Sequence, residues 1–141
     1  MAVRSPITRD DEWFTNEAKT VSFEVLDADP EENAAAAPVD VSAFAMSWKL
    51  IDWNEQTDRN RSKKTAAELL SLATSGGGIT VTGAFNATRS LNTQRVEVAV
   101  TAALTQDIEG DRERWHELRR TDGGAEAVLA YGPAYLCQSA T

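Results

Sequence analysis

One histidine, His116, and one cysteine, Cys137, are the side chains in this sequence best suited to nucleophilic or general-base chemistry. They lie 21 positions apart, and a catalytic dyad would need the fold to bring them within hydrogen-bond reach. Two such residues also fall short of the four ligands of a structural zinc site. We therefore interpret Cys137 as a buried structural thiol and His116 as a partly exposed strand residue. We expect no catalytic residue and no enzyme.

Clustered carboxylates raise the question of calcium binding. Four acidic residues lie within 27–32, and three alternate over 107–111. Neither group has the calcium-loop pattern of alternating Asp or Asn with a glycine and a distal Glu. Arg112 and Arg114 follow the second group at once and compete for its charge. We interpret both as solvated loops, with calcium binding as the alternative, for which the alternation over 107–111 is the more suggestive.

The glycine triplet Gly76–Gly78 resembles a phosphate-binding loop only superficially. A phosphate loop spaces its glycines, ends in Gly-Lys-Ser or Gly-Lys-Thr, and continues into a helix. Here the strand-like run Ile79–Thr82 follows instead. We therefore predict a turn at the triplet and no cofactor.

Charge and composition exclude several classes of protein. The 141 residues carry 14 Lys and Arg against 22 Asp and Glu, a net charge of -8, which argues against binding to nucleic acid or to a membrane surface. Residues 1–53 hold 4 basic and 11 acidic side chains, and residues 54–141 hold 10 and 11. No run of about 18 apolar residues could span a bilayer. The first residues lack the apolar stretch of a secretory signal, so we expect synthesis in a reducing cytoplasm.

The elements that must position these residues are strands, because apolar and polar residues alternate along most of the chain. The clearest strands are 19–26, 44–53 and 94–101, with Trp48 as the core anchor. Further strands are expected at 79–82, 114–120, 125–131 and 134–137, with a hairpin turn at 121–124 and a kink or bulge at Gly132–Pro133. The phase of strand 114–120 is ambiguous. The run Thr65–Ala73 predicts one short helix, and the alternative is an irregular strand with Leu70 and Leu72 inward.

This pattern predicts an all-β fold, an immunoglobulin-like antiparallel β-sandwich with an extended N-terminal arm and at most one short helix. A small closed barrel is the alternative. We divide the chain into the arm, residues 1–18, and the sandwich domain, residues 19–141. The aromatic pair Trp13 and Phe14 either pins the arm to its own domain or reaches a neighbouring subunit.

The order of the signals resembles the immunoglobulin-like structural domains of tailed bacteriophages, and is similar to the N-terminal domain of the phage baseplate upper protein. The likeness covers about residues 19–138. Its motifs, in chain order, are Phe23-x-Val25, Val39–Ser42, Ser47–Leu50, Gly77–Thr82, Val96–Val100, Trp115–Asp122 and Val128–Gly132. The resemblance implies a virion structural protein with no catalytic residues to transfer. Because no receptor-binding or fibre segment follows, we expect a protein that decorates or cements the capsid, with a baseplate, tail or head–tail adaptor protein as the alternative.

The expected partners are other virion proteins, either capsid or tail components, contacted as a homo-oligomer or by many copies on a symmetric lattice. The residues expected at the interface are Asp10, Asp11, Trp13, Phe14, Arg119 and Arg120. Arg119 and Arg120 could equally pair with acidic groups of their own domain. A further alternative is a carbohydrate- or host-surface-binding module, in which exposed Trp53, Trp115 or Tyr135 would form a platform.

Overall fold

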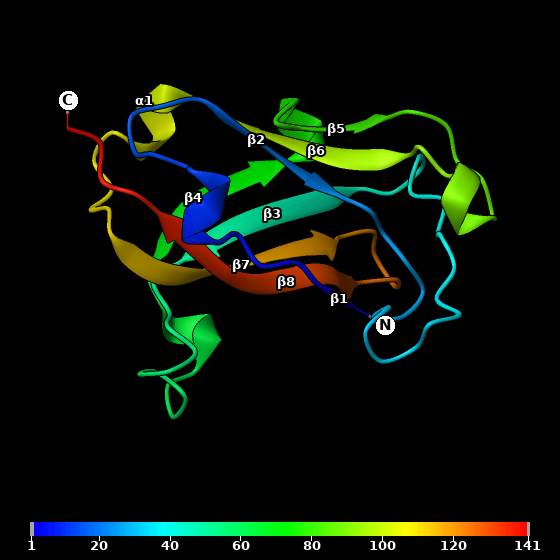
Figure 1. Ribbon diagram of the computed structural model, residues 1–141, viewed down its shortest axis with the longest axis horizontal. Coiled ribbons are helices and arrows are strands. Elements are labelled where there is room, and N and C mark those ends of the chain that lie inside the picture. The colour runs from blue at the N-terminus through cyan, green and yellow to red at the C-terminus, as the bar shows by residue number, and fades with distance from the viewer. Residues whose placement is uncertain (1, 141) are drawn as a thin grey trace.

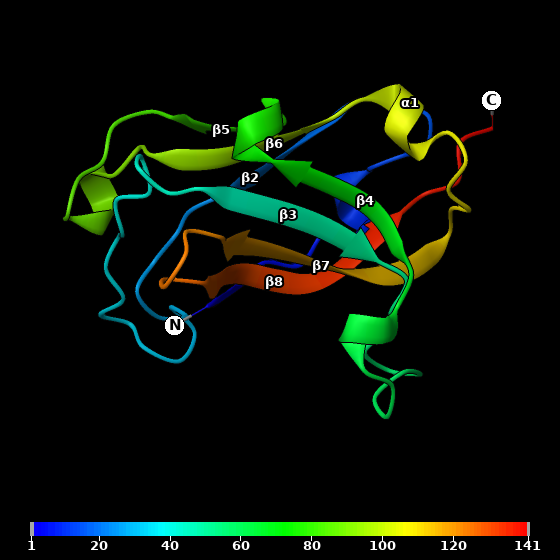
Figure 2. The same ribbon diagram turned by 180° about the vertical axis from the view of Figure 1, so that it is seen from behind.

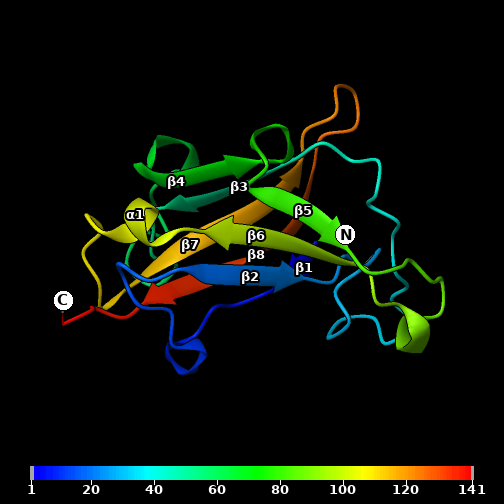
Figure 3. The same cartoon turned by 90° about the horizontal axis from the view of Figure 1, so that it is seen from above.

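A computed structural model describes residues 2–140, and within them eight strands form two sheets that pack face to face (Figure 1, Figure 3). The five-stranded sheet has the order β1 (Val3–Arg4), β8 (Ala127–Leu136), β7 (Arg112–Arg120), β3 (Met46–Ile51), β4 (Glu68–Ala73). The three-stranded sheet has the order β2 (Lys19–Phe23), β6 (Arg95–Val100), β5 (Ile79–Thr82). The one α-helix of this range, α1, spans Ala102–Thr105. The all-β sandwich prediction is confirmed.

The core lies between the sheets and takes its side chains from the alternating positions that the sequence predicted. Trp48 and Leu50 of β3 are fully buried, and so are Val96 and Val98 of β6. Apart from β1, neighbouring strands pair in the antiparallel sense, so facing residues meet in register. The ambiguous phase of β7 is resolved with Leu118 pointing into the core.

The predicted helix over Thr65–Ala73 is wrong. A 3-10 turn spans Lys63–Thr65, and the chain then continues as strand β4, which pairs with β3. Leu70 lies opposite Leu50, and Leu72 lies opposite Trp48. Pairing with β3 supplies backbone hydrogen bonds and buries Leu70, and this non-local gain outweighs the helical preference of the segment. The alternative prediction, an irregular strand with Leu70 and Leu72 inward, describes this segment.

The predicted kink or bulge at Gly132–Pro133 does not interrupt the strand, because β8 runs from Ala127 to Leu136 and pairs with β7 in regular register at both residues. The irregularity in its pairing lies instead opposite the Leu118–Arg119 step of β7. Gly132 has a different role. A Cβ at this position would lie 3.1 Å from the backbone of Ser5 and Pro6, so the glycine lets the N-terminal arm approach the sheet closely.

The N-terminal arm forms an edge of the five-stranded sheet, where it follows β8 (Figure 1). Strand β1 runs parallel to β8, with Val3 opposite Ala130. Farther along, the Ile7 amide donates to Pro133 O at 2.9 Å, and the Cys137 amide donates to Trp13 O at 2.7 Å. The arm is therefore hydrogen-bonded to its own domain over most of its length.

Trp13 anchors the arm in the core. Its side chain is 1% exposed, and its ring centroid lies 6.2 Å from that of Trp48. The arm thus supplies one of the largest buried side chains of the domain. Folding of residues 19–140 and docking of the arm are consequently coupled.

We predict that Trp13→Ala lowers the free energy of unfolding by about 3–5 kcal/mol, because it removes a large buried aromatic side chain and leaves a cavity. Urea unfolding followed by far-UV circular dichroism measures the change. Leu91→Ala is the control, since Leu91 is 64% exposed and its loss should change stability by less than about 0.5 kcal/mol. Equal, small effects of the two substitutions would contradict the burial of Trp13.

Candidate protein-binding face

His116, expected to be partly exposed, is fully buried. Its Nδ1 accepts a hydrogen bond from Trp48 Nε1 at 3.1 Å, so its proton is on Nε2, which donates to Ser5 O at 2.7 Å. Burial lowers the pKa of His116 to about 4. The ring therefore stays neutral near pH 7 and links β3, β7 and the arm.

His116 and Cys137 do not form a dyad. The β7–β8 register places His116 opposite Gly132, five positions before Cys137 along the chain. At roughly 3.3 Å per strand residue, this corresponds to a separation of about 17 Å. Cys137 is only half-buried, beside Phe14 of the arm, rather than buried as predicted.

The acidic groups considered for calcium do not converge. No group of three or more His, Cys, Asp or Glu side chains within residues 2–140 is arranged to hold a metal ion. Asp27 instead accepts a hydrogen bond from the Ala37 amide at 2.9 Å, and Asp29 accepts one from the Glu31 amide at 3.1 Å. Over the same residues, no helix is long and apolar enough to cross a membrane.

The expected interface residues of the arm face different surroundings. Trp13 lies in the core, and Phe14 is half-buried next to Cys137. Asp11 turns back to accept a hydrogen bond from the Thr8 amide at 2.6 Å, while Asp10 is exposed. Trp13 thus packs inside its own domain, whereas Phe14 stays partly exposed.

Arg119 and Arg120, adjacent on β7, point to opposite faces of the sheet. Arg120 donates from Nε to Asp122 at 2.6 Å, and its guanidinium lies 3.7 Å from the centroid of the Phe44 ring. The bond from Arg120, helped by the Ala45 amide, lowers the pKa of Asp122. Arg119 lies on the outer face, 3.9 Å from Glu117. Only Arg119 of this pair reaches the surface described next.

The outer face of the five-stranded sheet carries a groove of about 380 Å³ over β3, β4 and β7. The groove is lined by Ser47, Lys49, Ile51, Lys63, Lys64, Ala66, Glu68, Glu117, Arg119 and Thr121. Its four cations and two carboxylates give it a formal charge of +2, in a chain whose net charge is -8. Lys49 is central, since it pairs across strands with Glu117 and lies 3.6 Å from Glu68. This basic groove is a candidate site for an acidic partner.

One wall of the groove covers the aromatic residues that were expected to form a platform. Lys63 Nζ lies 4.7 Å from the Trp53 ring centroid and 4.4 Å from the Trp115 ring centroid. Trp53 is 7% exposed and Trp115 is 4% exposed. The third ring, Tyr135, lies beneath Arg9 at 4.9 Å. None of these three rings offers an open flat face to a sugar, which removes the feature on which the carbohydrate-binding alternative depended.

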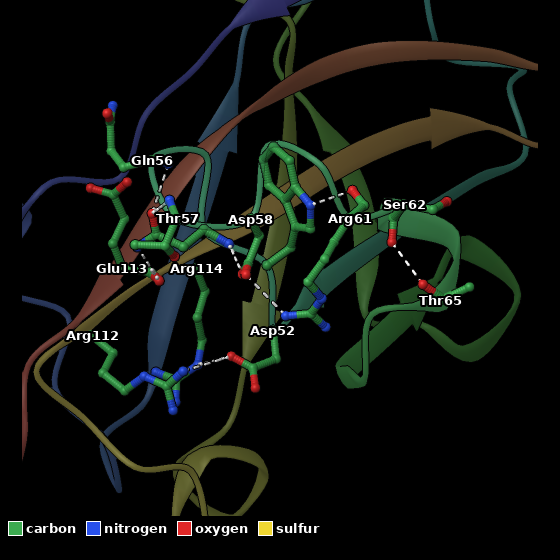
Figure 4. Close-up of polar contacts among 12 residues, drawn as sticks. Asp52, Gln56, Thr57, Asp58, Arg61, Ser62, Thr65, Arg112, Glu113 and Arg114 are labelled. Carbon is green, nitrogen blue, oxygen red and sulfur yellow. Dashed lines mark hydrogen bonds and ion pairs between the residues drawn. The ribbon is translucent and has the colours of Figure 1, made fainter.

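A polar network holds the loop that carries Lys63 (Figure 4). Trp53 Nε1 donates to Arg61 O at 3.1 Å, and Arg61 pairs with Asp58 at 3.0 Å. The Asn54 amide and Arg61 together lower the pKa of Asp58. Beside this network Arg112 pairs with Asp52 at 3.2 Å (Figure 4). The loop is therefore built from its own side chains and positioned over the groove.

The buried Arg114 lies at the edge of the same network. Its Nε is 3.8 Å from Asp52, too far for a hydrogen bond, and burial followed by repulsion from Arg112 lowers its pKa. Its side chain is 3% exposed. Asp52 thus partly balances two arginines at one end of the sandwich.

The chain matches no protein-family model, and no curated protein matches it at a significant level.

The sequence analysis named Arg119 but missed Lys49, Lys63 and Glu68 as members of one site. The alternation of residues 44–51 did place Lys49 on the face opposite Trp48. Its neighbours there depend on the β3–β4 and β3–β7 registers, which local patterns do not specify.

We predict that acid destabilises the protein through His116. The unfolded chain binds a proton at His116 near pH 6.5, whereas the folded protein does so only near pH 4, so the unfolded state takes up more protons between these values. The contribution of His116 to the free energy of unfolding is therefore complete above pH 6.5. The free energy of unfolding falls by roughly 3 kcal/mol as the pH drops to 4. Urea unfolding at several pH values measures this slope. The variant His116→Gln should show a shallower slope, because it lacks this contribution. An unchanged slope would contradict the assignment of the pH dependence to His116.

We predict that Lys63→Ala uncovers Trp53 and Trp115. Acrylamide should then quench tryptophan fluorescence more efficiently, and stability should fall by about 0.5–1 kcal/mol with the loss of the cation–π contacts. The matched control is Lys64→Ala, because Lys64 makes no ring contact in residues 2–140. Identical quenching in the two variants would show that Lys63 does not cover the rings.

Proposed function

We propose that this chain is a non-enzymatic structural protein of a tailed-phage virion, which decorates or cements the capsid through protein–protein contacts. Its fold would be an immunoglobulin-like sandwich. The observation that carries the proposal is the strand order, which agrees with the fold implied by the sequence resemblance.

The strand order supports the immunoglobulin-like assignment as follows. In chain order, β2 to β8 take the places B, C, C′, D, E, F and G of such a sandwich. One sheet then contains B, E and D, and the other contains C′, C, F and G, as in immunoglobulin-like domains. This distribution needs several crossings between the sheets and does not follow from a simple series of hairpins.

The core supports the same assignment. Antibody domains pack a strand-C tryptophan against a disulfide that joins strands B and F. Here Trp48 of β3 occupies the strand-C position, and its ring centroid lies 6.1 Å from that of His116 on β7. His116 in turn lies 5.7 Å from Phe23 of β2. The pair Phe23 and His116 thus spans the two sheets where the disulfide would lie.

The surface fits a protein that acts through contacts with other proteins. It combines an acidic N-terminal third with the basic groove over β3, β4 and β7. On a symmetric lattice, many individually weak contacts of this kind add to a strong attachment. The same surface suits a tail, baseplate or head–tail adaptor protein, which differs in its location on the virion.

Immunogold electron microscopy tests the proposal on purified virions of the phage or prophage that encodes the chain. Antibodies against the purified chain should label the capsid in many copies, with an antibody against a non-virion protein of the same phage as the control. Label confined to the tail would replace capsid decoration by the tail alternative. Absence of the chain from virions, checked by mass spectrometry, would overturn the proposal.

A further inference from the structure

We propose that two copies of this chain pair through the outer face of the five-stranded sheet, with an acidic loop of each copy against a basic loop of the other. The acidic loop is residues 27–32, and the basic loop is residues 59–64. This pairing does not rest on the virion role, because it concerns the isolated chain in solution.

The acidic loop carries four carboxylates and no cation. Residues 27–38 contain Asp27, Asp29, Glu31 and Glu32 but neither lysine nor arginine. Glu31 and Glu32 are exposed, and no ion pair within residues 2–140 involves any of the four. The acidic loop thus concentrates four negative charges, and no cation within residues 2–140 forms an ion pair with any of them.

The basic loop is its counterpart. It carries Arg59, Arg61, Lys63 and Lys64 and no carboxylate. Arg61 is paired with Asp58 and Lys63 covers two tryptophan rings. Arg59 and Lys64 are exposed, and neither has a carboxylate at ion-pair distance within the described range 2–140. Arg59 donates hydrogen bonds to Glu55 O and Gln56 Oε1, both uncharged acceptors, so its charge and that of Lys64 are not balanced by a carboxylate within the described residues.

The placement of the two loops makes the pairing symmetric. Both loops extend below the five-stranded sheet, on the side away from the three-stranded sheet, and they lie at opposite ends of the molecule (Figure 1, Figure 2). A twofold axis through the middle of this face exchanges the two ends. Each acidic loop then meets the partner's basic loop, and both contacts form at once.

The face between the loops is compatible with its own copy. Its charges alternate in sign, with Lys49 and Arg119 beside Glu68 and Glu117. A twofold axis can therefore bring cations of one copy to carboxylates of the other. Since these charges are exposed, we expect the contact to weaken strongly with added salt.

Sedimentation velocity at low ionic strength tests the pairing over a range of protein concentrations. The wild-type chain should form a dimer that dissociates in high salt. Glu31→Lys with Glu32→Lys, and separately Arg59→Glu with Lys64→Glu, should each weaken dimerisation by roughly tenfold or more, because the altered loop loses its net charge and its two reversed side chains repel those they faced.

Mixing the two charge-reversed variants is the decisive experiment. In the mixed dimer one contact joins the two unaltered loops, and in the other the reversed lysines face the reversed glutamates, so a heterodimer should form although each variant alone dimerises weakly. This complementation also separates a lost interface from a misfolded variant. The control, Glu12→Lys with Glu17→Lys on the arm, changes the net charge as the acidic-loop variant does and should leave the dimer intact.

A wild-type chain that stays monomeric at low salt would overturn the proposal. So would a control variant that dissociates as readily as the loop variants, a mixture that stays monomeric, or assembly that continues beyond the dimer. None of these outcomes depends on whether the chain is found in virions.

Discussion

The two hydrogen bonds of His116 join the parts of the molecule that the rest of the structure depends on. One comes from the Trp48 indole of β3, and the other goes to the Ser5 carbonyl of the arm. Both require a neutral ring with its proton on Nε2, which the burial of the ring favours. Trp13 then packs against Trp48, and Gly132 leaves room for the arm beside β8. The arm, the core tryptophan and the central strands therefore form one cooperative unit.

This arrangement determines which surfaces are left for partners. Trp13 of the arm is committed to the core of its own domain, and Lys63 covers the aromatic residues of the outer sheet face. The surfaces that remain for partners are charged. An acidic N-terminal third and a basic groove are carried by the same chain, so its surface is suited to contacts that repeat between copies or with a charged neighbour.

Local patterns in the sequence predicted much of the fold, because strands buried on one face alternate visibly. This held for Trp48 and its neighbours, and for the valines of β6. The predictions failed where a distant segment decides the outcome. Thr65–Ala73 becomes a strand because β3 offers an edge, and Gly132–Pro133 stays in register with β7 where the arm lies beside β8. The burial of His116 depends on which face of β7 points inward. The sequence left this open, because the apolar residues Trp115 and Leu118 lie on opposite faces of the strand. For the candidate site, Arg119 was foreseen, but its grouping with Lys49 and Lys63 required the strand registers and the path of the loop.

Native-state hydrogen exchange, followed residue by residue by NMR, tests most directly whether the arm is part of the cooperative unit. The informative amides are those of Ile7, bonded to Pro133 O, and of Cys137, bonded to Trp13 O. Val98, in the middle of the three-stranded sheet, provides the reference for global unfolding. Our account predicts that the amides of Ile7 and Cys137 exchange only when the whole domain unfolds, with the same opening free energy as Val98. Fast exchange of both while Val98 stays protected would show that the arm opens independently, and would contradict the account.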